Sequence, residues 1–551
     1  MMIGLDVGGT HTDVVLTEHQ QILATAKVLT NHRNLLDSIC QGFAMVLQGR
    51  DPEQVRRIHL STTLSTNAIV EDTLEAVGVM VSAGPGIHPR CYCIGEHYFV
   101  IDGFLDHRGT EIRPLNSHQI QEAVAVCQQN GVNLYAVISK FSPRNPAHEQ
   151  SMFASLKDRA DYVTVGHRLS GQLNFPRRIA TAYYNSAVWR IYNRFADAIE
   201  QSVQELGLQA SAHILKADGG TMPMTIAKKF PVESILSGPA ASIMGIIALC
   251  DIHEDAVILD IGGTTTDIAI FVGGAPLIEP QGIALNGHHT LVRALKTRSI
   301  GIGGDSALRL SEHGLTVGPV RLGPAMAKGG QHPTLIDACN VKGLAAYGDL
   351  HASQAGLKKL AASASLSPEN LAEEAVQYAT RTIHREVECL LAEINAKPVY
   401  TIHEFLEEQT ITPQTLYIMG GPAPVFSQTL ASEFGYQAII PENYAVANAV
   451  GAALTRQTME IELFADTEKN IMLIPTLNVQ QKISGRYSLD EAKQDAVRYL
   501  QKYVKQLGTE ETAQFIEVTE AEAFTMVNGF YMTSKNIRVK CQIKPGIRKN
   551  W

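Results

Sequence analysis

The chain has 551 residues, of which 45% are hydrophobic and 18% are charged, as is typical of a folded protein with more than one domain. Its formal net charge of −9 at pH 7, without a long basic run, argues against a dedicated binder of nucleic acid or membrane surfaces. No stretch approaches the roughly 18 unbroken apolar residues that a membrane span needs.

The first part of the chain, residues 1–185, is predicted to be an α/β domain. An apolar strand over residues 3–8 ends at Gly8-Gly9, and two further strands follow it up to residue 30. A helix is expected near 35–47, because its apolar residues recur at helical spacing. Strands and helices then alternate, which favours a central sheet with helices against it.

Residues 181–206 have the clearest helical pattern, and we expect this helix to lead into a second α/β domain over residues 186–460. Beyond this point the composition becomes more polar. A polar helix within 483–508 and two later strand patterns predict a small α+β C-terminal module over residues 461–551.

Two stretches of the chain are nearly the same phrase. Residues 5–16 read LDVGGTHTDVVL and residues 259–270 read LDIGGTTTDIAI, identical at seven of twelve positions. Each predicts two antiparallel strands joined by a glycine-rich turn. A chance repeat one domain length apart is improbable, so we expect two similar hairpins from two similar domains, facing each other across a cleft.

Such turns suit phosphate groups. Glycine leaves the backbone N–H groups open, successive N–H groups form an anion-binding nest, and threonine hydroxyls add donors. The aspartate that precedes each turn, Asp6 or Asp260, can hold Mg²⁺ through water or set the geometry of phosphoryl transfer. Asp13 and Asp267 are expected to brace the hairpins. The predicted phosphate-binding residues are Gly8, Gly9, Thr10 and Thr12 in the first copy, and Gly262, Gly263, Thr264, Thr265 and Thr266 in the second.

This pair of turns resembles the phosphate-1 and phosphate-2 loops of the actin, sugar-kinase and Hsp70 ATPase superfamily. The resemblance implies two actin-like, ribonuclease H-like domains around a nucleotide cleft. It also implies an adenosine motif, for which LYIMGGPAPVF (416–426) is the candidate through Gly420 and Gly421.

Several further motifs resemble those of the ATP-binding A-type subunit of the hydantoinase/oxoprolinase family. They are STTLSTNAIVE (61–71), GGTMP (219–223), SGPAAS (237–242), IGIGGDS (300–306) and PENYAVANAVGAA (441–453). The resemblance covers roughly residues 1–460. In the glycine turn of IGIGGDS it implies a nucleotide contact through Gly303 and Gly304, but the family has a small residue where Asp305 stands here.

The resemblance implies an ATP- and Mg²⁺-dependent enzyme that phosphorylates the amide oxygen of a cyclic amide or imide, such as hydantoin or 5-oxoproline, so that water can open the ring. It implies catalytic and metal-binding roles for Asp6 and Asp260. It also implies substrate contacts for Thr62, Thr63 and Asn67, although the segment that contains these three residues also fits the capped start of a helix. A B-type partner subunit is implied as well, and a homo-oligomer is compatible with the sequence.

Two other functions fit the same residues. One is a stand-alone small-molecule kinase of the same superfamily, and the other is a non-catalytic ATP-driven switch protein. The adjacent His288 and His289 point in different directions on a strand and are expected to be structural or on the surface. The eight cysteines complete no zinc or iron–sulfur ligand set, and no leader pattern precedes the first strand, so we expect a cytoplasmic protein with reduced thiols.

Overall fold

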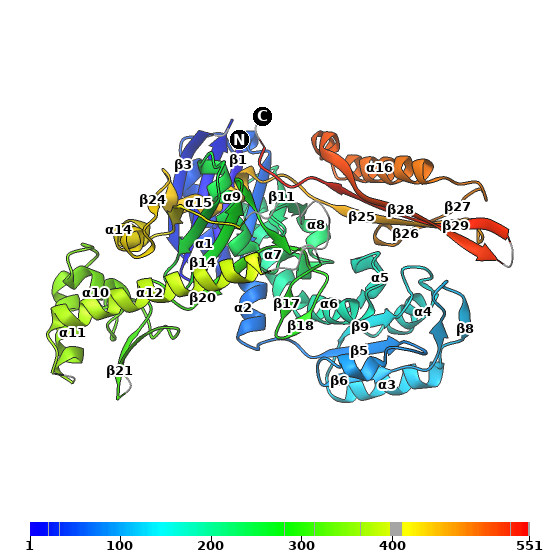
Figure 1. Ribbon diagram of the computed structural model, residues 1–551, viewed down its shortest axis with the longest axis horizontal. Coiled ribbons are helices and arrows are strands. Elements are labelled where there is room, and N and C mark those ends of the chain that lie inside the picture. The colour runs from blue at the N-terminus through cyan, green and yellow to red at the C-terminus, as the bar shows by residue number, and fades with distance from the viewer. Residues whose placement is uncertain are drawn as a thin grey trace.

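In the computed structural model, the described residues are 1–19, 21–31, 34–279, 281–312, 314–363, 365–396, 410–528 and 531–548. Two sheets form a central body, from which three further parts extend (Figure 1). Met1 and Arg548 line one cavity, so the two ends of the described chain lie close together. Among the described residues, none of the helices combines the length and the apolar content that a bilayer crossing requires.

The first central sheet is built on the first glycine-rich hairpin. Strand β1 runs antiparallel to β2 and parallel to β4, and β4 runs parallel to β11. In their spatial order the strands are β12 (Thr221–Pro223), β11 (Ser211–Leu215), β4 (Arg57–Thr62), β1 (Met2–Val7), β2 (His11–Glu18) and β3 (Gln21–Leu29). Because β11 and β12 join this sheet, the first lobe continues beyond the predicted boundary at residue 185.

The predicted helix over residues 181–206 is two helices. α6 (Phe175–Ala187) and α7 (Trp189–Glu205) meet at Val188, which ends one helix and precedes the next. α7 packs Tyr192 and Phe195 into the core of the first sheet, together with α1 (Leu35–Leu47). α7 therefore belongs to the first lobe rather than bridging to the second.

The second central sheet repeats the first. Its strands are β15 (Ala275–Pro276), β14 (Thr266–Val272), β13 (Ala256–Ile261), β23 (Thr415–Met419) and β24 (Gln437–Ile439), with β20 (Thr297–Ile300) also paired to β14. β13 pairs antiparallel with β14 and parallel with β23, as β1 does with β2 and β4. The order and directions of the strands thus confirm the prediction of two similar α/β domains.

Two helices fill the space between the sheets, α9 (Ser237–Leu249) and α15 (Ala447–Leu454). Their approach depends on glycine. A Cβ atom on Gly4 of β1 would lie 2.0 Å from the carbonyl oxygen of Ala449, and one on Gly451 would lie 2.4 Å from the nitrogen of Gly245. The lack of side chains at these positions lets α15 contact β1 and α9 backbone to backbone.

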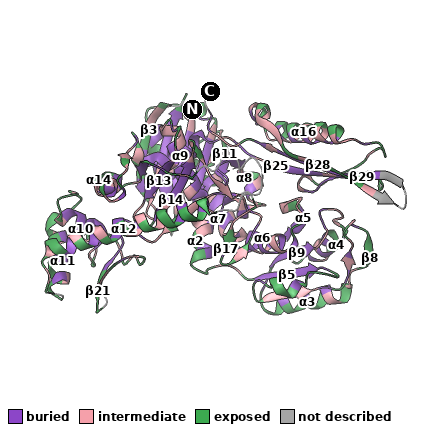
Figure 2. Cartoon of the chain, viewed as in Figure 1, coloured by how far each residue is buried: buried purple, intermediate pink, exposed green. Residues whose placement is uncertain are grey.

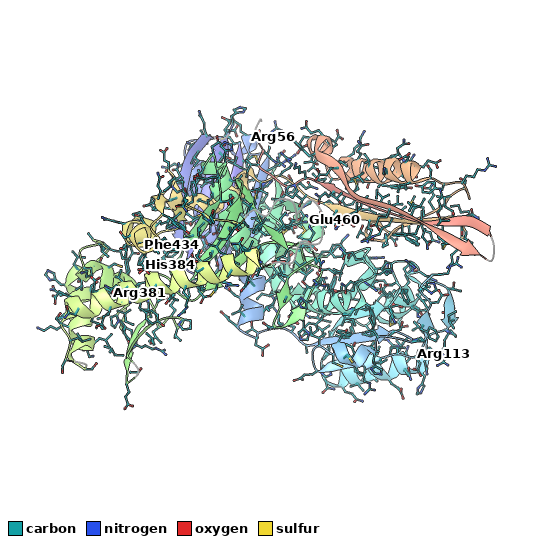
Figure 3. All side chains as sticks on the ribbon, in the orientation of Figure 1. Arg56, Arg113, Arg381, His384, Phe434 and Glu460 are labelled. Atoms are coloured by element: carbon teal, nitrogen blue, oxygen red, sulfur yellow. The ribbon has the colours of Figure 1, made fainter. Side chains whose placement is uncertain are left out.

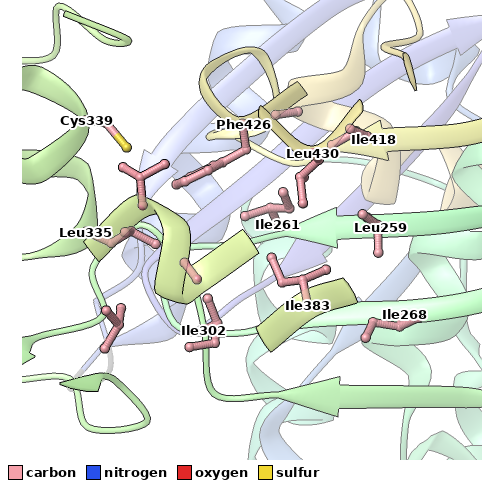
Figure 4. Close-up of a cluster of buried hydrophobic side chains, with 14 of the residues drawn as sticks. Leu259, Ile261, Ile268, Ile302, Leu335, Cys339, Ile383, Ile418, Phe426 and Leu430 are labelled. Carbon is pink, nitrogen blue, oxygen red and sulfur yellow. The ribbon is translucent and has the colours of Figure 1, made fainter. Parts of the chain in front are cut away.

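The outer face of the second sheet carries the largest apolar cluster. Figure 4 shows Leu259 and Ile268 of the sheet packed against Ile383, Phe426 and Leu430 of the covering helices. The elements on this side and in its extension are β21 (Leu308–Ser311), β22 (Gly314–Val317), α10 (Leu335–Val341), α11 (Leu350–Ala362), α12 (Pro368–Asn395) and α14 (Ala423–Phe434).

An inserted unit lies between β4 and β11 in the sequence. Its sheet is entirely parallel, in the order β10 (Tyr162–Val165), β9 (Leu134–Ser139), β5 (Val77–Ser82) and β6 (His97–Val100). Every residue of β5 and β9 is buried, as expected for a parallel sheet with helices on both faces. The covering helices include α3 (Ser117–Gln129), α4 (Ala147–Leu156) and α6.

The C-terminal module is α+β, as predicted. Its strands lie in the order β27 (Val479–Lys482), β26 (Ile471–Ile474), β25 (Glu460–Asp466), β29 (Tyr531–Ile543) and β28 (Ile516–Asn528). Helix α16 (Leu489–Gln506) packs Ala496, Leu500 and Val504 onto this sheet and exposes its other face (Figure 2).

The remaining elements are short. They are α2 (Leu64–Val70), α5 (Gly166–Leu169), α8 (Met224–Ala227), β7 (Phe104–Leu105), β8 (Glu111–Arg113), β16 (Ile278–Glu279), β17 (Ala284–Leu285), β18 (His288–His289), β19 (Ala294–Leu295), η1 (Pro52–Gln54), η2 (Pro89–Tyr92), η3 (Pro231–Ser234), η4 (Met326–Lys328), η5 (Tyr444–Val446), η6 (Pro475–Leu477) and η7 (Glu510–Phe515).

Candidate functional site

The two repeated phrases form equivalent turns. The backbone N–H of Gly8 donates to the carbonyl of His11 at 3.1 Å, and that of Gly262 donates to the carbonyl of Thr265 at 2.8 Å. Within the described part of the chain, the N–H groups of Gly263 and Thr264 meet no acceptor. The second turn therefore presents successive open N–H groups, the arrangement that binds an anion.

Each hairpin places two carboxylates opposite each other. Asp6 of β1 pairs in register with Asp13 of β2, and Asp260 of β13 pairs with Asp267 of β14. The side-chain amide of Asn448, near the start of α15, lies between the two hairpins. Its Nδ2 is 3.4 Å from Asp6 Oδ2 and 3.2 Å from Asp260 Oδ2. One side chain thus joins the two halves of the repeat.

Two serines hold the first aspartate of each hairpin in matching ways. Ser61 Oγ donates to Asp6 Oδ1 at 2.5 Å, and Ser242 Oγ donates to Asp260 Oδ2 at 2.6 Å. Ser61 is the second-last residue of the neighbouring strand β4, whereas Ser242 lies on α9. The carboxylates are therefore fixed in position by neutral donors.

Burial makes this a poor environment for negative charge. It raises the pKa of Asp6 to about 7, with the charges of Asp13 and Asp260 adding to the effect. Burial, together with the charges of Asp260 and Asp6, likewise raises the pKa of Asp267 to about 7. The pKa of Asp260 is also raised, chiefly by burial. Such a cluster accepts a proton or a cation more readily than isolated carboxylates do.

The two halves differ in how they offset that charge. Asp13 is paired with Lys27 of β3, with Nζ–Oδ distances of 2.6 and 2.8 Å. At the equivalent place in the second hairpin, Asp267 faces Ser299 of β20. Asp267 Oδ1 is buried and has no hydrogen-bond partner within the described residues. The second hairpin therefore carries a carboxylate oxygen that no described residue satisfies.

The threonines separate into two groups. Thr12 is fully buried and its hydroxyl is 3.0 Å from that of Thr30, while the buried Thr266 donates to the carbonyl of Ile302 at 2.7 Å. These two hydroxyls brace the hairpins. By contrast, Thr10, Thr264 and Thr265 are at least partly exposed, and their hydroxyls make no hydrogen bond within the described residues.

The turn at Gly303-Gly304 packs against the second hairpin. The N–H of Gly304 donates to the carbonyl of Gly262 at 3.0 Å, and that of Asp305 donates to the carbonyl of Gly263 at 2.6 Å. The N–H of Gly303 donates to Ser306 Oγ at 2.8 Å. The N–H groups of Gly304 and Asp305 are thus bonded to the phosphate-type turn, and the nucleotide contact of Gly303 and Gly304 remains a prediction.

Strand β23 leads through Gly420 and Gly421 into α14, as the sequence predicts for an adenosine motif. Gly420 has φ +89°, and a Cβ atom there would lie 2.3 Å from the carbonyl oxygen of Ile261 and 2.6 Å from Asp260 Oδ1. Gly421 has open space around it. Only glycine therefore allows this loop to pass beside the second hairpin.

The predicted substrate segment begins with Thr62, the last residue of β4, and continues into α2. Thr62 is buried, and its backbone pairs with Ser237, whose hydroxyl donates to the Thr62 carbonyl at 2.8 Å. Thr63 and Asn67 lie on the more open side, with Asn67 Nδ2 3.4 Å from Thr63 Oγ1. The register Asp6–Ser61 and Val7–Thr62 brings this segment next to the first hairpin.

Ser61, Ser242 and Asn448 were not assigned a role from the sequence. All three lie inside motifs that the sequence singled out, but only the packing of β4, α9 and α15 against the hairpins reveals their partners. His288 and His289 form the short strand β18 away from these carboxylates.

The described residues fit Mg²⁺ only if water and substrate phosphates supply some of its ligands. No group of three or more histidine, cysteine, aspartate or glutamate side chains among them could hold a metal ion by itself. Mg²⁺ commonly binds through one or two carboxylates, water and substrate phosphates. The unsatisfied oxygen of Asp267 and the buried Asp6 and Asp260 suit that mode.

A separate cavity of about 150 Å³ lies where the first lobe, the inserted unit and the C-terminal module meet. Glu460, labelled in Figure 3, lines it together with Arg293, to which it is paired. Lys216 and Asp218, also in its wall, are paired with each other at 3.0 Å. These charged groups largely satisfy one another, so the hairpins remain the better candidate site.

Comparison with known proteins agrees with the duplicated architecture. Residues 178–461 match the family described as Hydantoinase/oxoprolinase, and residues 2–159 match the Hydantoinase/oxoprolinase N-terminal region. The chain is 25% identical over 476 residues to caprolactamase subunit alpha of Pseudomonas jessenii, a match that covers 80% of this chain and 68% of that protein.

Two solved structures share its fold. A nucleotide-free structure of acetone carboxylase has a TM-score of 0.75 and 15% identity, and covers 100% of this chain and 88% of its own. The crystal structure of the ATP-dependent caprolactamase from Pseudomonas jessenii has a TM-score of 0.67 and 18% identity, and covers 98% of this chain and 87% of its own.

Proposed function

This chain belongs to the hydantoinase/oxoprolinase family, and we propose that it uses ATP to activate a cyclic amide or imide for ring-opening hydrolysis. The observation that carries the proposal is the pair of phosphate-type hairpins joined by Asn448 between Asp6 and Asp260. The similarity to an ATP-dependent caprolactamase supports a cyclic amide as the substrate class.

The chemistry requires two bond changes on phosphorus. The amide oxygen attacks the terminal phosphate of ATP, an O–P bond forms, and the bond to the β-phosphate oxygen breaks to release ADP. Water then adds to the activated carbon, and the ring nitrogen leaves with a proton, which gives an acyl phosphate. A second water attacks the same carbon, and phosphate departs with the original amide oxygen when the C–O bond breaks. An unactivated amide is a poor electrophile, so ATP supplies the driving force.

Different residues are assigned to phosphate binding, to Mg²⁺ and to the adenosine. We assign phosphate binding to the open N–H groups of the second turn and to the free hydroxyls of Thr10, Thr264 and Thr265, because positioning and charge neutralisation dominate phosphoryl transfer. Asp260 and Asp6 are assigned to transfer geometry and to Mg²⁺, which would help neutralise the phosphate charge when bound. Gly420 and Gly421 are assigned to the adenosine, and Gly303 and Gly304 to a further nucleotide contact beside the second turn, to which Gly304 is bonded.

We place the cyclic amide beside Thr63 and Asn67, on the open side of the segment that follows β4. Thr62 contributes through its backbone position. A B-type subunit is proposed as the partner that completes hydrolysis, in keeping with a relative named as a subunit. A protein that depends on ATP in this way is expected in the cytoplasm.

An oxygen-labelling experiment tests the proposal. The purified chain, alone and with a candidate B-type subunit, is incubated with Mg²⁺, ATP and a panel of carbonyl-¹⁸O cyclic amides, including caprolactam, 5-oxoproline and hydantoin. Mass spectrometry then follows the label. We expect ¹⁸O in inorganic phosphate together with a ring-opened product, and loss of both in Asp260→Ala with unfolding that remains cooperative.

Other outcomes would replace the proposal. A stable phosphorylated small molecule formed without any partner would indicate a stand-alone kinase. ATP turnover that no small molecule changes would indicate a switch protein. Full turnover by Asp260→Ala would show that the second hairpin does not carry the transferring phosphate.

A further inference from the structure

An ion pair lies beside the second phosphate-type turn. Asp305 Oδ2 accepts a hydrogen bond from Arg321 Nη2 at 3.0 Å. The same oxygen lies 3.1 Å from the position that a Cβ atom on Gly263 would take. The backbone of Asp305 is tied to this turn by its N–H bond to the Gly263 carbonyl. A carboxylate oxygen is thus held against the turn that is proposed to receive phosphate.

This arrangement is unfavourable for a phosphate unless something changes. Two negative groups a few ångströms apart repel each other, and the effect is stronger in a partly buried cleft than in water. Burial raises the pKa of Asp305, which agrees with a carboxylate that is poorly hydrated. A nucleotide can therefore bind well here only with a cation that offsets both charges.

Arg321 can supply the positive charge that offsets Asp305 and a bound phosphate. Its guanidinium carries five N–H donors, and one of them is used by Asp305. Its Nε is buried and has no acceptor within the described residues, while the side chain as a whole is 29% exposed. Arginine binds phosphate and carboxylate oxygens with the same planar fork, so it can pass from one to the other.

The pair also faces the first hairpin. His11, from the first turn, is close enough to Asp305 and Arg321 that the two charges shift its pKa in opposite directions. Asp305 and Arg321 belong to the second lobe and His11 to the first. The ion pair therefore lies on the side of the second lobe that faces the first hairpin.

We propose that Arg321 binds the terminal phosphate of the nucleotide, and that Asp305 stands in for that phosphate while the cleft is empty. This inference rests on the proposed function, since it takes ATP as the ligand. Arg321 is then a catalytic residue that contacts the transferring group. Asp305 is a positioning residue that holds Arg321 beside the turn and competes with the phosphate for it.

The competition gives the two residues opposite effects on nucleotide affinity. Arg321→Met should weaken binding of a non-hydrolysable ATP analogue about 10- to 100-fold, the effect of losing a hydrogen bond between charged groups. ADP lacks the terminal phosphate, so its affinity should change less than about 3-fold. Asp305→Asn should tighten binding of the ATP analogue by about 3- to 10-fold, because it removes the repulsion and releases Arg321.

Isothermal titration of the full chain with each nucleotide and Mg²⁺ measures these changes. Arg385→Met is the matched control, because Arg385 is 68% exposed and paired with Glu386 in the same lobe. If the methionine variant does not fold, Arg321→Lys keeps a charge without the fork and should still lose affinity for the ATP analogue. Equal losses for ATP analogue and ADP, or weaker ATP-analogue binding by Asp305→Asn, would overturn the inference.

A failure of the proposed function would look different. In that case the wild-type chain would bind neither nucleotide, and the assignment of both hairpins would fail together with this inference. Normal wild-type binding with no change in either variant would overturn only the role of Arg321 and Asp305.

Discussion

Replacing Asp6 with asparagine is expected to stabilise the folded protein at pH 8. Asp6 is 9% exposed, and the pKa of its carboxyl group is raised from 3.8 to about 7, mainly because burial disfavours the charged form. Asparagine has nearly the same shape and carries no charge to bury. Ser61 donates to Oδ1 and Asn448 to Oδ2, so the amide oxygen of asparagine keeps one of these two hydrogen bonds.

The magnitude follows from the pKa. Each unit by which folding raises it corresponds to about 1.36 kcal/mol, so the ionised group destabilises the fold by about 4 kcal/mol at pH 8 as an upper limit. Between pH 3.8 and about 7 the folded wild type binds a proton that the unfolded chain has released. The wild type therefore loses stability as the pH rises through this window, and the variant does not.

Urea unfolding at several pH values measures the effect. The variant should match the wild type near pH 4, exceed it by about 1–2 kcal/mol near pH 5, and exceed it most at pH 8. Asp37→Asn is the control, since Asp37 is exposed on α1 of the same lobe. A variant no more stable than wild type at pH 8, or a difference that does not vary with pH, would refute the idea that the cluster stores unfavourable charge.

Three further changes test the site and its support. Gly420→Ala should destabilise the protein by more than about 2 kcal/mol and remove nucleotide binding, because Gly420 has φ +89° and a Cβ atom there would lie 2.3 Å from a backbone oxygen. Gly421 has open space around it, so the control Gly421→Ala should fold normally by circular dichroism. Asn448→Leu should lower ATP turnover by about 10- to 100-fold, as measured by phosphate release, because it removes the amide between the two hairpin aspartates; unchanged turnover would show that this bridge is dispensable. Phe426→Ala should lower the free energy of unfolding by about 3–5 kcal/mol in a urea titration, since Phe426 is 1% exposed in the core of Figure 4, and a loss below about 1 kcal/mol would mean that this core relaxes around the cavity.

Local sequence was sufficient to predict the two hairpins and the glycine loop after β23. In each case the turn, its glycines and its flanking strands lie within about a dozen residues, and their hydrogen bonds close within the same stretch. The repetition of one phrase also indicated two similar domains, because two copies of a hairpin imply two copies of the sheet around it.

The division of the predicted helix at 181–206 and the extent of the first lobe beyond residue 185 depend on contacts between residues far apart in the sequence. A helical pattern continues through Val188, but the chain divides there into α6 and α7. The pairing of β11 with β4 joins residues some 150 positions apart, across an inserted unit with its own sheet. The residue pattern of β4 or of β11 does not specify which strand it pairs with.

By itself the sequence thus determined where the two glycine-rich turns form, because such a turn is a local property of Gly-Gly-Thr. Only the tertiary structure decided which of their N–H groups and hydroxyls are available and what surrounds them. Packing turned Thr12 and Thr266 inward, brought Asn448 between two distant aspartates, and set Arg321 against Asp305. The physical reason is that burial and charge pairing depend on neighbours in space, which strands and helices distant in the chain supply.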